Sequence, residues 1–201
     1  MIAIIDYGAG NIFSVKNAFD YLGYDCKLTN SEDEIKKADG IILPGVGAFP
    51  AAMNMLNNSG LVPLIHEQTK IKPFLGICLG MQLIFEKGYE FEECDGLGLI
   101  PGAVKKIERT DMPIPHMGWN ELKIQNECPL FKGLPENPYV YFVHSFAAEC
   151  NDDNVAAYCD YGGKVTAMVQ DNKYVFGAQF HPEKSGEVGL QILKNFAELT
   201  K

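Results

Sequence analysis

The sequence predicts an α/β domain with a mostly parallel central sheet flanked by helices and an added patch of antiparallel strands. Three observations support this fold class. Short apolar runs alternate with helix-spaced segments through the first half of the chain, strand-like segments follow residue 85, and an amphipathic segment closes the sequence. Alternating strands and helices are typical of a parallel sheet that is covered on both faces. At 201 residues, we expect one domain over residues 1–201.

The first half of the chain provides the parallel strands and their helices. Buried strands are predicted at residues 2–6, 26–29, 40–43 and 73–78. Helices are predicted between them at residues 11–24, 31–38, 51–56 and 62–69. Asn11 is expected to cap the first helix, and Ser31 with Glu34 has the spacing of a capping box on the second.

The second half is predicted to be mainly antiparallel. Strand-like segments separated by Gly, Asn and Asp lie at residues 96–108, 139–149, 154–161, 164–170 and 173–180. The last segment, 185–200, places Val188, Ile192, Phe196 and Leu199 at helical spacing, which predicts an amphipathic helix. We find no internal repeat and no linker.

Composition limits the classes of function. The chain is 47% hydrophobic and 21% charged, and its net charge of −9 argues against nucleic acid or an anionic membrane as the main partner. Its six cysteines form no Cys-x-x-Cys pair, which favours reduced thiols over disulfides or a zinc site. No apolar run approaches the length of a membrane span. We expect a cytoplasmic protein that needs no metal or other cofactor and binds no nucleic acid and no membrane.

The stretch PFLGICLGMQLIF, at residues 73–85, places a cysteine between two glycines. One apolar run ends at Cys78 and a second begins at Leu79, with Gly76 and Gly80 two residues to either side. Glycine permits a sharp turn and a close approach of chain elements. The pattern is typical of a strand-to-helix elbow that carries a nucleophile, here a sulfur. The alternative is a small core residue, and a base and an orienting acid elsewhere in the chain decide between the two.

The segment HPEKS provides those partners. His181 follows a predicted buried strand, and Glu183 lies two residues on, across Pro182. In extended chain, residues two apart point to the same side. The carboxylate of Glu183 can therefore accept a hydrogen bond from one imidazole nitrogen while the other nitrogen faces Cys78, which completes a nucleophile, a base and an orienter. His66 is predicted on a helix surface, and His144 as a strand residue that lines the site.

The surroundings of Cys78 are expected to favour negative charge. Free N–H groups and the dipole at the start of the following helix stabilise a thiolate. The N–H of Leu79 is one donor for the oxyanion that forms when a carbonyl is attacked, and the loop Gly45-Val46-Gly47 at the end of a neighbouring strand can supply another. Glycine loops at strand ends are also ordinary turns.

These segments together resemble the class I (triad-type) glutamine amidotransferases. PGVGAF at 44–49, GICLGMQLIF at 76–85 and GAQFHPEKS at 177–185 match the three signatures of the family. DYGAGN at 6–11 and PHMGWN at 115–120, with YFVHS at 141–145, resemble its histidine-biosynthesis branch. The resemblance implies one flavodoxin-like amidotransferase domain over residues 1–201. It also implies an enzyme that hydrolyses glutamine to glutamate and ammonia through a thioester on Cys78.

The resemblance also implies a substrate pocket. Gln82 and Glu90 occupy positions where the family holds the amino-acid head of glutamine, and an amide and a carboxylate are suitable partners for an α-ammonium group. Backbone groups around Gly47 and Ser145 complete the pocket in the family. From the residues alone, Gln82 and Glu90 can equally be polar side chains on a helix surface.

The partner implied by the resemblance is a (β/α)8-barrel cyclase, bound as a heterodimer, through which ammonia passes. Docking of this kind calls for exposed apolar and aromatic groups on the active-site face. Trp119, Met117 and Tyr141 are suited to this role, and Asn11 and Lys184 match family positions at that interface. A core position for Trp119, the single tryptophan, is the alternative.

Three other functions fit the same motifs in part. A paralogous glutaminase that supplies ammonia for sugar amination in surface polysaccharide synthesis shares the whole catalytic pattern. A stand-alone γ-glutamyl hydrolase shares the triad but needs no partner, and PHMGWN argues against it. A catalytically silent regulator on the same fold is disfavoured because Cys78, His181 and Glu183 are all present.

Overall fold

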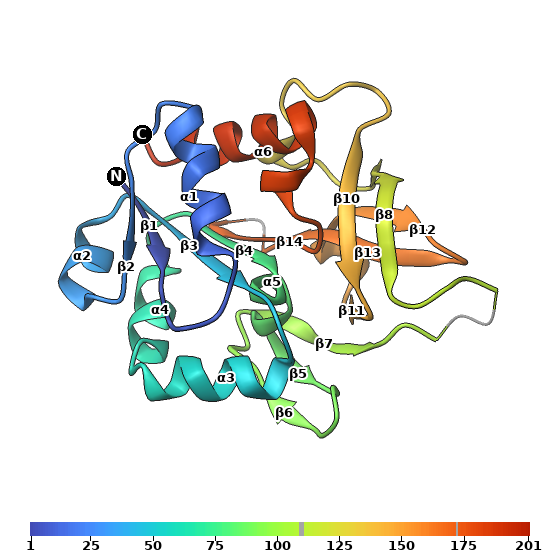
Figure 1. The fold of residues 1–201 in the computed structure, drawn as a ribbon, viewed down its shortest axis with the longest axis horizontal. Helices are drawn as coiled ribbons and strands as arrows, with labels where there is room; N and C mark the ends of the chain where they lie inside the picture. The colour runs from blue at the N-terminus through green and yellow to red at the C-terminus, as the bar shows by residue number, and fades with distance from the viewer. Residues whose placement is uncertain (109–110, 172) are drawn as a thin grey trace.

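The computed structural model describes residues 1–108, 111–171 and 173–201. Its centre is an eight-stranded sheet in the order β2-β1-β3-β4-β14-β13-β12-β9 (Figure 1). The strands from β2 to β14 are parallel to one another, and the pairs beyond β14 are antiparallel. The bounds are β1 Ile2–Ile5, β2 Cys26–Thr29, β3 Gly40–Gly45, β4 Phe74–Cys78, β9 Lys123–Ile124, β12 Val155–Asp160, β13 Lys164–Gln170 and β14 Val175–Ala178. The predicted parallel sheet with an antiparallel extension is therefore confirmed.

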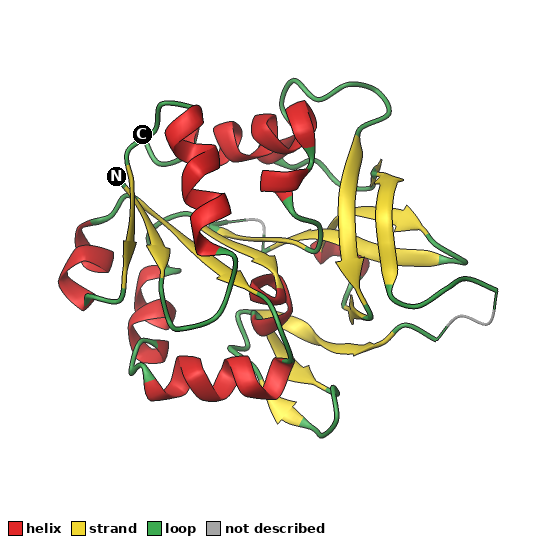
Figure 2. Cartoon of the chain, viewed as in Figure 1, coloured by secondary structure: helices red, strands yellow, loops and turns green. Residues whose placement is uncertain are grey.

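Helices cover both faces of the parallel part of this sheet. Figure 1 and Figure 2 show α1 and α6 on one side and α3 and α4 on the other. The bounds are α1 Ile12–Tyr21, α2 Glu32–Lys37, α3 Phe49–Asn58, α4 Val62–Gln68, α5 Leu79–Leu83 and α6 Gly186–Glu198. Among the described residues, none of the helices is both long and apolar enough to cross a bilayer.

Two hydrophobic cores result from the alternation of side chains along the strands. In β1, Ile2 and Ile4 pack in the core that contains α1 and α6, whereas Ala3 and Ile5 pack in the core that contains α3 and α4. Successive side chains of a strand point to opposite faces, so a strand covered on both faces is apolar throughout. This explains why the first strands read as unbroken apolar runs.

Two smaller sheets flank the central one. One pairs β8 (His116–Glu121) with β10 (Tyr139–His144), and the other has the order β11-β7-β5-β6. The predicted strand at 139–149 was therefore wrong in one respect, because the chain breaks at Ser145 and β10 and β11 enter different sheets. The remaining bounds are β5 Phe85–Gly88, β6 Cys94–Asp95, β7 Ile100–Lys106, β11 Phe146–Glu149, and 3-10 turns η1 Pro129–Phe131, η2 Asp152–Asn154 and η3 Pro182–Lys184.

The capping hydrogen bonds predicted at the start of α1 and α2 were wrong. Asn11 and Ser31 do precede α1 and α2, but neither side chain bonds to the helix backbone. Asn11 accepts a hydrogen bond from the hydroxyl of Ser14 at 2.9 Å. Glu34 is bound by Lys27, at 2.6 Å, and by a hydroxyl of β2 rather than by the backbone of Ser31. A charged partner on the neighbouring strand competes successfully with the cap.

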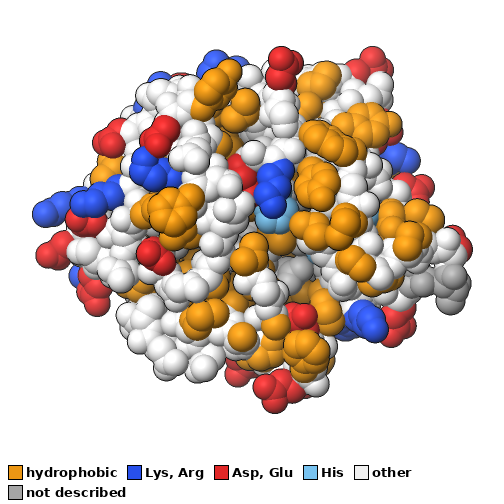
Figure 3. Space-filling model, in the orientation of Figure 1, with side chains coloured by type: hydrophobic (Ala, Val, Ile, Leu, Met, Phe, Trp, Pro, Cys, Tyr) orange, Lys and Arg blue, Asp and Glu red, His pale blue; other side chains and the backbone are white. Residues whose placement is uncertain are grey.

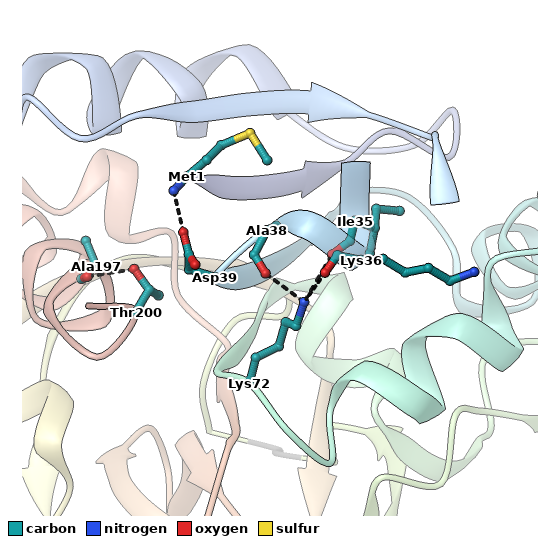
Figure 4. Close-up of polar contacts among 8 residues, drawn as sticks. All are labelled: Met1, Ile35, Lys36, Ala38, Asp39, Lys72, Ala197 and Thr200. Carbon is teal, nitrogen blue, oxygen red and sulfur yellow. Dashed lines mark hydrogen bonds and ion pairs between the residues drawn. The ribbon is translucent and has the colours of Figure 1, made fainter. Parts of the chain in front are cut away.

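The carbonyl end of α2 is instead closed by a lysine from outside the helix. The ammonium nitrogen of Lys72 donates to the backbone oxygens of Ile35, Lys36 and Ala38 at 3.3, 2.9 and 2.6 Å (Figure 4). Burial lowers the pKa of Lys72. A cation at the C-terminus of a helix binds the carbonyls that lack a partner in the helix. The contact joins the α2–β3 turn to the segment that leads into β4, the strand that carries Cys78.

Candidate active site

Cys78 lies at a strained turn between β4 and α5. Its φ of 55° and ψ of −113° lie in a region that a non-glycine residue rarely occupies. Such strain is maintained only where the surroundings enforce it and is common at functional sites. The backbone at Cys78 therefore makes the sharp strand-to-helix turn that was predicted for a nucleophile elbow. The side chain of Cys78 is buried.

The two glycines beside the elbow allow α5 to pack directly on the strands. A Cβ atom on Gly80 would lie 1.8 Å from the carbonyl oxygen of Leu43 in β3. A Cβ atom on Gly76 would lie 2.6 Å from the carbonyl oxygen of Gly80. Because neither distance is compatible with a side chain, glycine is required at both positions for the turn to form.

His181 and Glu183 adopt the predicted arrangement in the loop after β14. The Nδ1 atom of His181 lies 2.8 Å from Oε1 of Glu183, and the two side chains are only 4% and 1% exposed. The backbone N–H of His181 donates to the carbonyl of Tyr141 at 3.0 Å, which attaches the loop to β10. The hydroxyl of Ser185 donates to the carbonyl of His181 at 2.6 Å and accepts from the N–H of Tyr141 at 2.9 Å. The backbone of His181 is therefore fixed by hydrogen bonds at both its N–H and its carbonyl.

The charge on His181 depends on two opposing effects. Burial alone lowers the pKa of His181, but hydrogen bonds to Cys78 and Glu183 and the negative charges of both groups outweigh it and raise the pKa to about 9. The imidazole is then protonated at neutral pH. A protonated imidazole beside a thiol stabilises the thiolate and can donate a proton to a leaving group.

A pocket of about 300 Å³ opens at this point. Eight of the residues predicted for the site line it: Cys78, His181, Gly47, Leu79, Gln82, Glu90, His144 and Ser145. A larger hollow of about 550 Å³ lies between β7, β11 and β13 and shares none of these residues. Pocket volume alone would therefore not have selected the pocket that contains Cys78. Within the described part of the chain, no group of three or more His, Cys, Asp and Glu side chains is placed to hold a metal ion.

The glycine loop lies beside the nucleophile. Gly45 is the last residue of β3 and pairs in register with Cys78 of β4. Gly47 has a φ of +103°, and it lines the pocket together with Val46. Gly45 itself is not among the lining residues, because the backbone N of Gly80 and the hydroxyl of Tyr7 close the space above it. Of the two glycines predicted as oxyanion donors, only Gly47 reaches the pocket.

Gln82 and Glu90 both have structural partners in addition to facing the pocket. The Nε2 atom of Gln82 donates to the carbonyl of Phe146 at 3.1 Å and to Oε1 of Gln179 at 3.0 Å. Since both N–H groups are used, the group that Gln82 leaves for a ligand is its carbonyl oxygen. Oε2 of Glu90 accepts from the N–H of Phe49 at 2.8 Å, at the start of α3. Neither residue is an ordinary polar side chain on a helix surface.

Sequence reasoning missed two residues near the thiol. Gln179 is fully buried, and its Nε2 lies 4.0 Å from the sulfur of Cys78. Its signal was a polar residue in the otherwise apolar run before His181. The hydroxyl of Tyr7 is buried and, among the described residues, has no hydrogen-bond partner. Burial and the charge of Cys78 raise its pKa. The apolar first strand gave no indication that Tyr7 would approach the site.

The residues predicted for partner docking differ in their exposure. Met117 and Trp119 of β8 are 59% and 56% exposed, which rules out the alternative core position for Trp119. The rings of Trp119 and Tyr141 meet edge to face at 6.1 Å. Lys184 is exposed next to Glu183 in the loop after β14, and Asn11 is half-buried. Figure 3 shows hydrophobic side chains gathered over β8 and β10 on the face in view.

A thiol, an imidazole and a buried carboxylate in this order, at the carboxyl end of a parallel sheet, are an arrangement typical of cysteine-dependent acyl-transfer and hydrolysis enzymes. Comparison with known proteins indicates the family. Residues 3–199 match the model of the family described as "Glutamine amidotransferase class-I". The chain therefore belongs to the class I glutamine amidotransferase family.

Two similar proteins indicate the branch of this family to which the chain belongs. The imidazole glycerol phosphate synthase subunit HisH of Bacillus cereus (strain B4264) is 54% identical over 197 residues, covering 98% of this chain and 93% of that protein. The subunit of the same name from Bacillus thuringiensis (strain Al Hakam) is 52% identical over the same shares. Among solved structures, PurLQS from Thermotoga maritima is similar with a TM-score of 0.77 at 21% identity, over 100% of this chain and 98% of that chain. The chain is thus a glutaminase subunit of the imidazole glycerol phosphate synthase type.

Proposed function

We propose that Cys78 is the nucleophile that attacks the side-chain amide carbon of glutamine. The imidazolium of His181 holds the proton taken from the thiol and passes it to the nitrogen that leaves as ammonia, while Glu183 holds the imidazole in position. Water then attacks the resulting glutamyl thioester, which releases glutamate and restores the thiol. The observation that supports this most directly is the strained elbow of Cys78 beside an imidazole whose Nδ1 lies 2.8 Å from the Glu183 carboxylate.

The lining of the pocket suits the amino-acid head of glutamine. The free carbonyl oxygen of Gln82 and the carboxylate of Glu90 are acceptors for an α-ammonium group. Backbone groups of Ser145 and Gly47 serve the α-carboxylate and the amide oxygen, and the N–H of Leu79 is a further oxyanion donor. The two acceptors and the catalytic thiol border one pocket, so the head and the amide of a single glutamine can be held together.

The ammonia released at Cys78 is passed to a partner enzyme. Free ammonia would be lost by protonation and diffusion, so the product must enter the partner directly. The partner is a (β/α)8-barrel cyclase of histidine biosynthesis, bound as a heterodimer in the cytoplasm. It docks on the face that presents Met117, Trp119, Tyr141, Asn11 and Lys184. The exposure of the first two supports this role, because large exposed apolar side chains are typical of interface centres.

Replacing the nucleophile tests the mechanism. Cys78→Ala is expected to abolish hydrolysis of glutamine, because no thioester can form. The same variant, complexed with the cyclase, is expected to support cyclisation when ammonium salt replaces glutamine. Release of glutamate by the variant would refute the assignment of the nucleophile. Loss of the ammonium-supported reaction as well would show that the substitution does more than remove the thiol.

The isolated chain is expected to be a slow enzyme. The backbone at Val46 and Gly47 forms the oxyanion side of the pocket, and glycine peptides reorient at little steric cost. An oxyanion donor that is turned away costs ~3–4 kcal/mol of transition-state stabilisation, a factor of about 10² to 10³ in rate. Binding of the cyclase with its nucleotide ligand is therefore expected to raise kcat at least about a hundredfold and to change glutamine affinity far less. Equal rates for the free chain, the bare complex and the ligand-bound complex would favour a stand-alone hydrolase.

A further inference from the structure

Two buried histidines outside the triad form a pair behind the glutamine pocket. Nδ1 of His116, in β8, lies 3.0 Å from Nε2 of His144, in β10. The two residues are register partners on neighbouring antiparallel strands and are almost fully buried. Neither takes part in the chemistry assigned to Cys78, although His144 borders the pocket.

The contacts of the pair assign a proton to each ring. Nδ1 of His144 lies 2.8 Å from the carbonyl oxygen of Phe146, which can only accept, so this nitrogen carries a proton. Burial lowers the pKa of both His116 and His144 to about 4, so both rings are neutral at pH 7. Nε2 of His144 is then an acceptor, and Nδ1 of His116 is its donor. Nε2 of His116 is left to accept from the amide of Asn120 at 3.5 Å.

The pair continues into the wall of the pocket. The carbonyl oxygen of Phe146 that accepts from His144 also accepts from Nε2 of Gln82. The other N–H of that amide is bound to Gln179. One directed chain of hydrogen bonds therefore runs from Asn120 through both histidines to the Phe146 carbonyl, which is also an acceptor for the amide of Gln82.

His116 is also fixed by stacking. Its ring lies 3.9 Å from the ring of Tyr161 and 4.6 Å from that of Phe142, nearly parallel to both. The hydroxyl of Tyr161 donates to the carbonyl of Pro113 at 2.6 Å, which immobilises one of the two flanking rings. Stacking holds the plane of the imidazole, and the hydrogen bonds give it a direction. The two contributions can be removed separately by substitution.

We propose that His116 is a positioning residue for glutamine recognition, acting through His144 and the carbonyl of Phe146 on Gln82. The proposal rests on the proposed function, in which this pocket holds the amino-acid head of glutamine. Without the donor at Nδ1, His144 is free to change tautomer. Its unprotonated Nδ1 then faces the carbonyl oxygen of Phe146, and the repulsion between the two acceptors displaces this carbonyl from its contact with Gln82. Gln82 can then turn its N–H groups toward the pocket, where they repel an α-ammonium group. The effect falls on binding of the head, because the chain does not contact His181 or Glu183.

A matched pair of variants tests the proposal. His116→Phe keeps the stacked ring and removes the donor, whereas His116→Asn places an amide N–H near the position of Nδ1 and removes the ring. In the complex with the cyclase, His116→Phe is expected to raise the KM for glutamine about tenfold with kcat within about twofold. His116→Asn is expected to keep KM within about threefold of the parent. Urea unfolding of both variants reports whether packing is retained.

Several outcomes would overturn the proposal. These are a parental KM in His116→Phe, equal losses in both variants, or a loss in kcat alone. The tautomers provide a test that needs no variant, through imidazole nitrogen shifts of the unmodified protein labelled with ¹⁵N. Both rings are expected to be protonated at Nδ1 and unprotonated at Nε2, and the opposite tautomer on either ring would refute the chain. Failure of the proposed function would be distinct, since glutamate release by Cys78→Ala would reveal it whatever the tautomers.

Discussion

Replacing Glu183 with glutamine removes one charge from the proposed catalytic triad and leaves its shape. Oε1 of Glu183 accepts from Nδ1 of His181 at 2.8 Å, and the carboxylate is almost completely buried. Its second oxygen, Oε2, has no hydrogen-bond partner among the described residues. A glutamine can present its own Oε1 to the imidazole, so the variant mainly loses the negative charge that favours the imidazolium.

The size of the loss follows from the pKa of His181. Its rise from 6.5 to about 9 corresponds to about 3 kcal/mol of extra stabilisation of the imidazolium, at ~1.4 kcal/mol per pKa unit. Cys78 shares this effect, so removing the charge of Glu183 alone costs about 1.5 kcal/mol, or about tenfold in rate. An amide that turns its N–H groups toward Nδ1 would also select the wrong tautomer, which in triads costs up to about 10⁴-fold. We expect kcat to fall about 10³-fold, with little change in KM.

Glu183→Gln should change how activity and stability depend on pH, and the pKa of His181 gives the direction of both changes. In the proposed mechanism a protonated His181 is the acid for departing ammonia, so parental activity should fall as pH rises through about 9. In Glu183→Gln this limb should move toward 6.5. Stability follows the same sign: a raised pKa in the folded state stabilises the protein below about 6.5, and the gain is lost as pH rises to about 9. Glu183→Gln should lose the part of this dependence of stability on pH that the charge of Glu183 provides.

The assay is glutamate release by the cyclase complex between pH 6 and 10, with urea unfolding across the same range. Glu187→Gln, an exposed change of the same charge, is the control and should behave as the parent. A Glu183→Gln variant with an unshifted alkaline limb would refute the role of the carboxylate. A kcat within threefold of the parent would refute it as well.

Two further predictions concern packing and capping. Gly80→Ala should destabilise the fold by more than about 3 kcal/mol and abolish activity, since its Cβ would meet the carbonyl of Leu43 at 1.8 Å. The control is Gly60→Ala, at an open site with positive φ, which should cost about 1 kcal/mol in urea unfolding; equal losses would contradict the packing argument. Lys72→Met should cost about 2 kcal/mol, because three carbonyls lose their donor. Exposed Lys70→Met should be neutral, and an unchanged urea midpoint in Lys72→Met would contradict the cap.

The geometry of the turn at Cys78 and of the His181–Glu183 pair was predictable because local sequence encodes it. The glycines around Cys78 are required by distances within one turn, and His181 and Glu183 are separated by one proline. The buried strands were predictable for a similar reason, since a strand covered on both faces is apolar at every position.

Contacts between distant segments were not predictable in this way. The break at Ser145 sends β10 and β11 to different sheets, while the sequence around it continues as an even strand-like run. Glu34 has the spacing of a cap, but Lys27 of the neighbouring strand binds it instead. Gln179 becomes part of the site only because β14 lies beside β4 and carries it to the thiol. In each case the competing partner comes from elsewhere in the fold.

The central claim is that Cys78 is the reactive thiol of a glutamine pocket. Of the six cysteines, all in the described part of the chain, burial raises the pKa of Cys26, Cys128 and Cys150 to about 11, that of Cys159 to about 12, and that of Cys94 as well. These thiols should be inert near neutral pH.

The most direct measurement is covalent labelling of the cyclase complex at pH 7.5 with a glutamine-analogue electrophile. Peptide mass spectrometry then locates the modified residue. We predict a single adduct on Cys78, loss of glutaminase activity in proportion to labelling, and protection by glutamine. An adduct on another cysteine, or labelling of Cys78 that glutamine does not slow, would contradict the account.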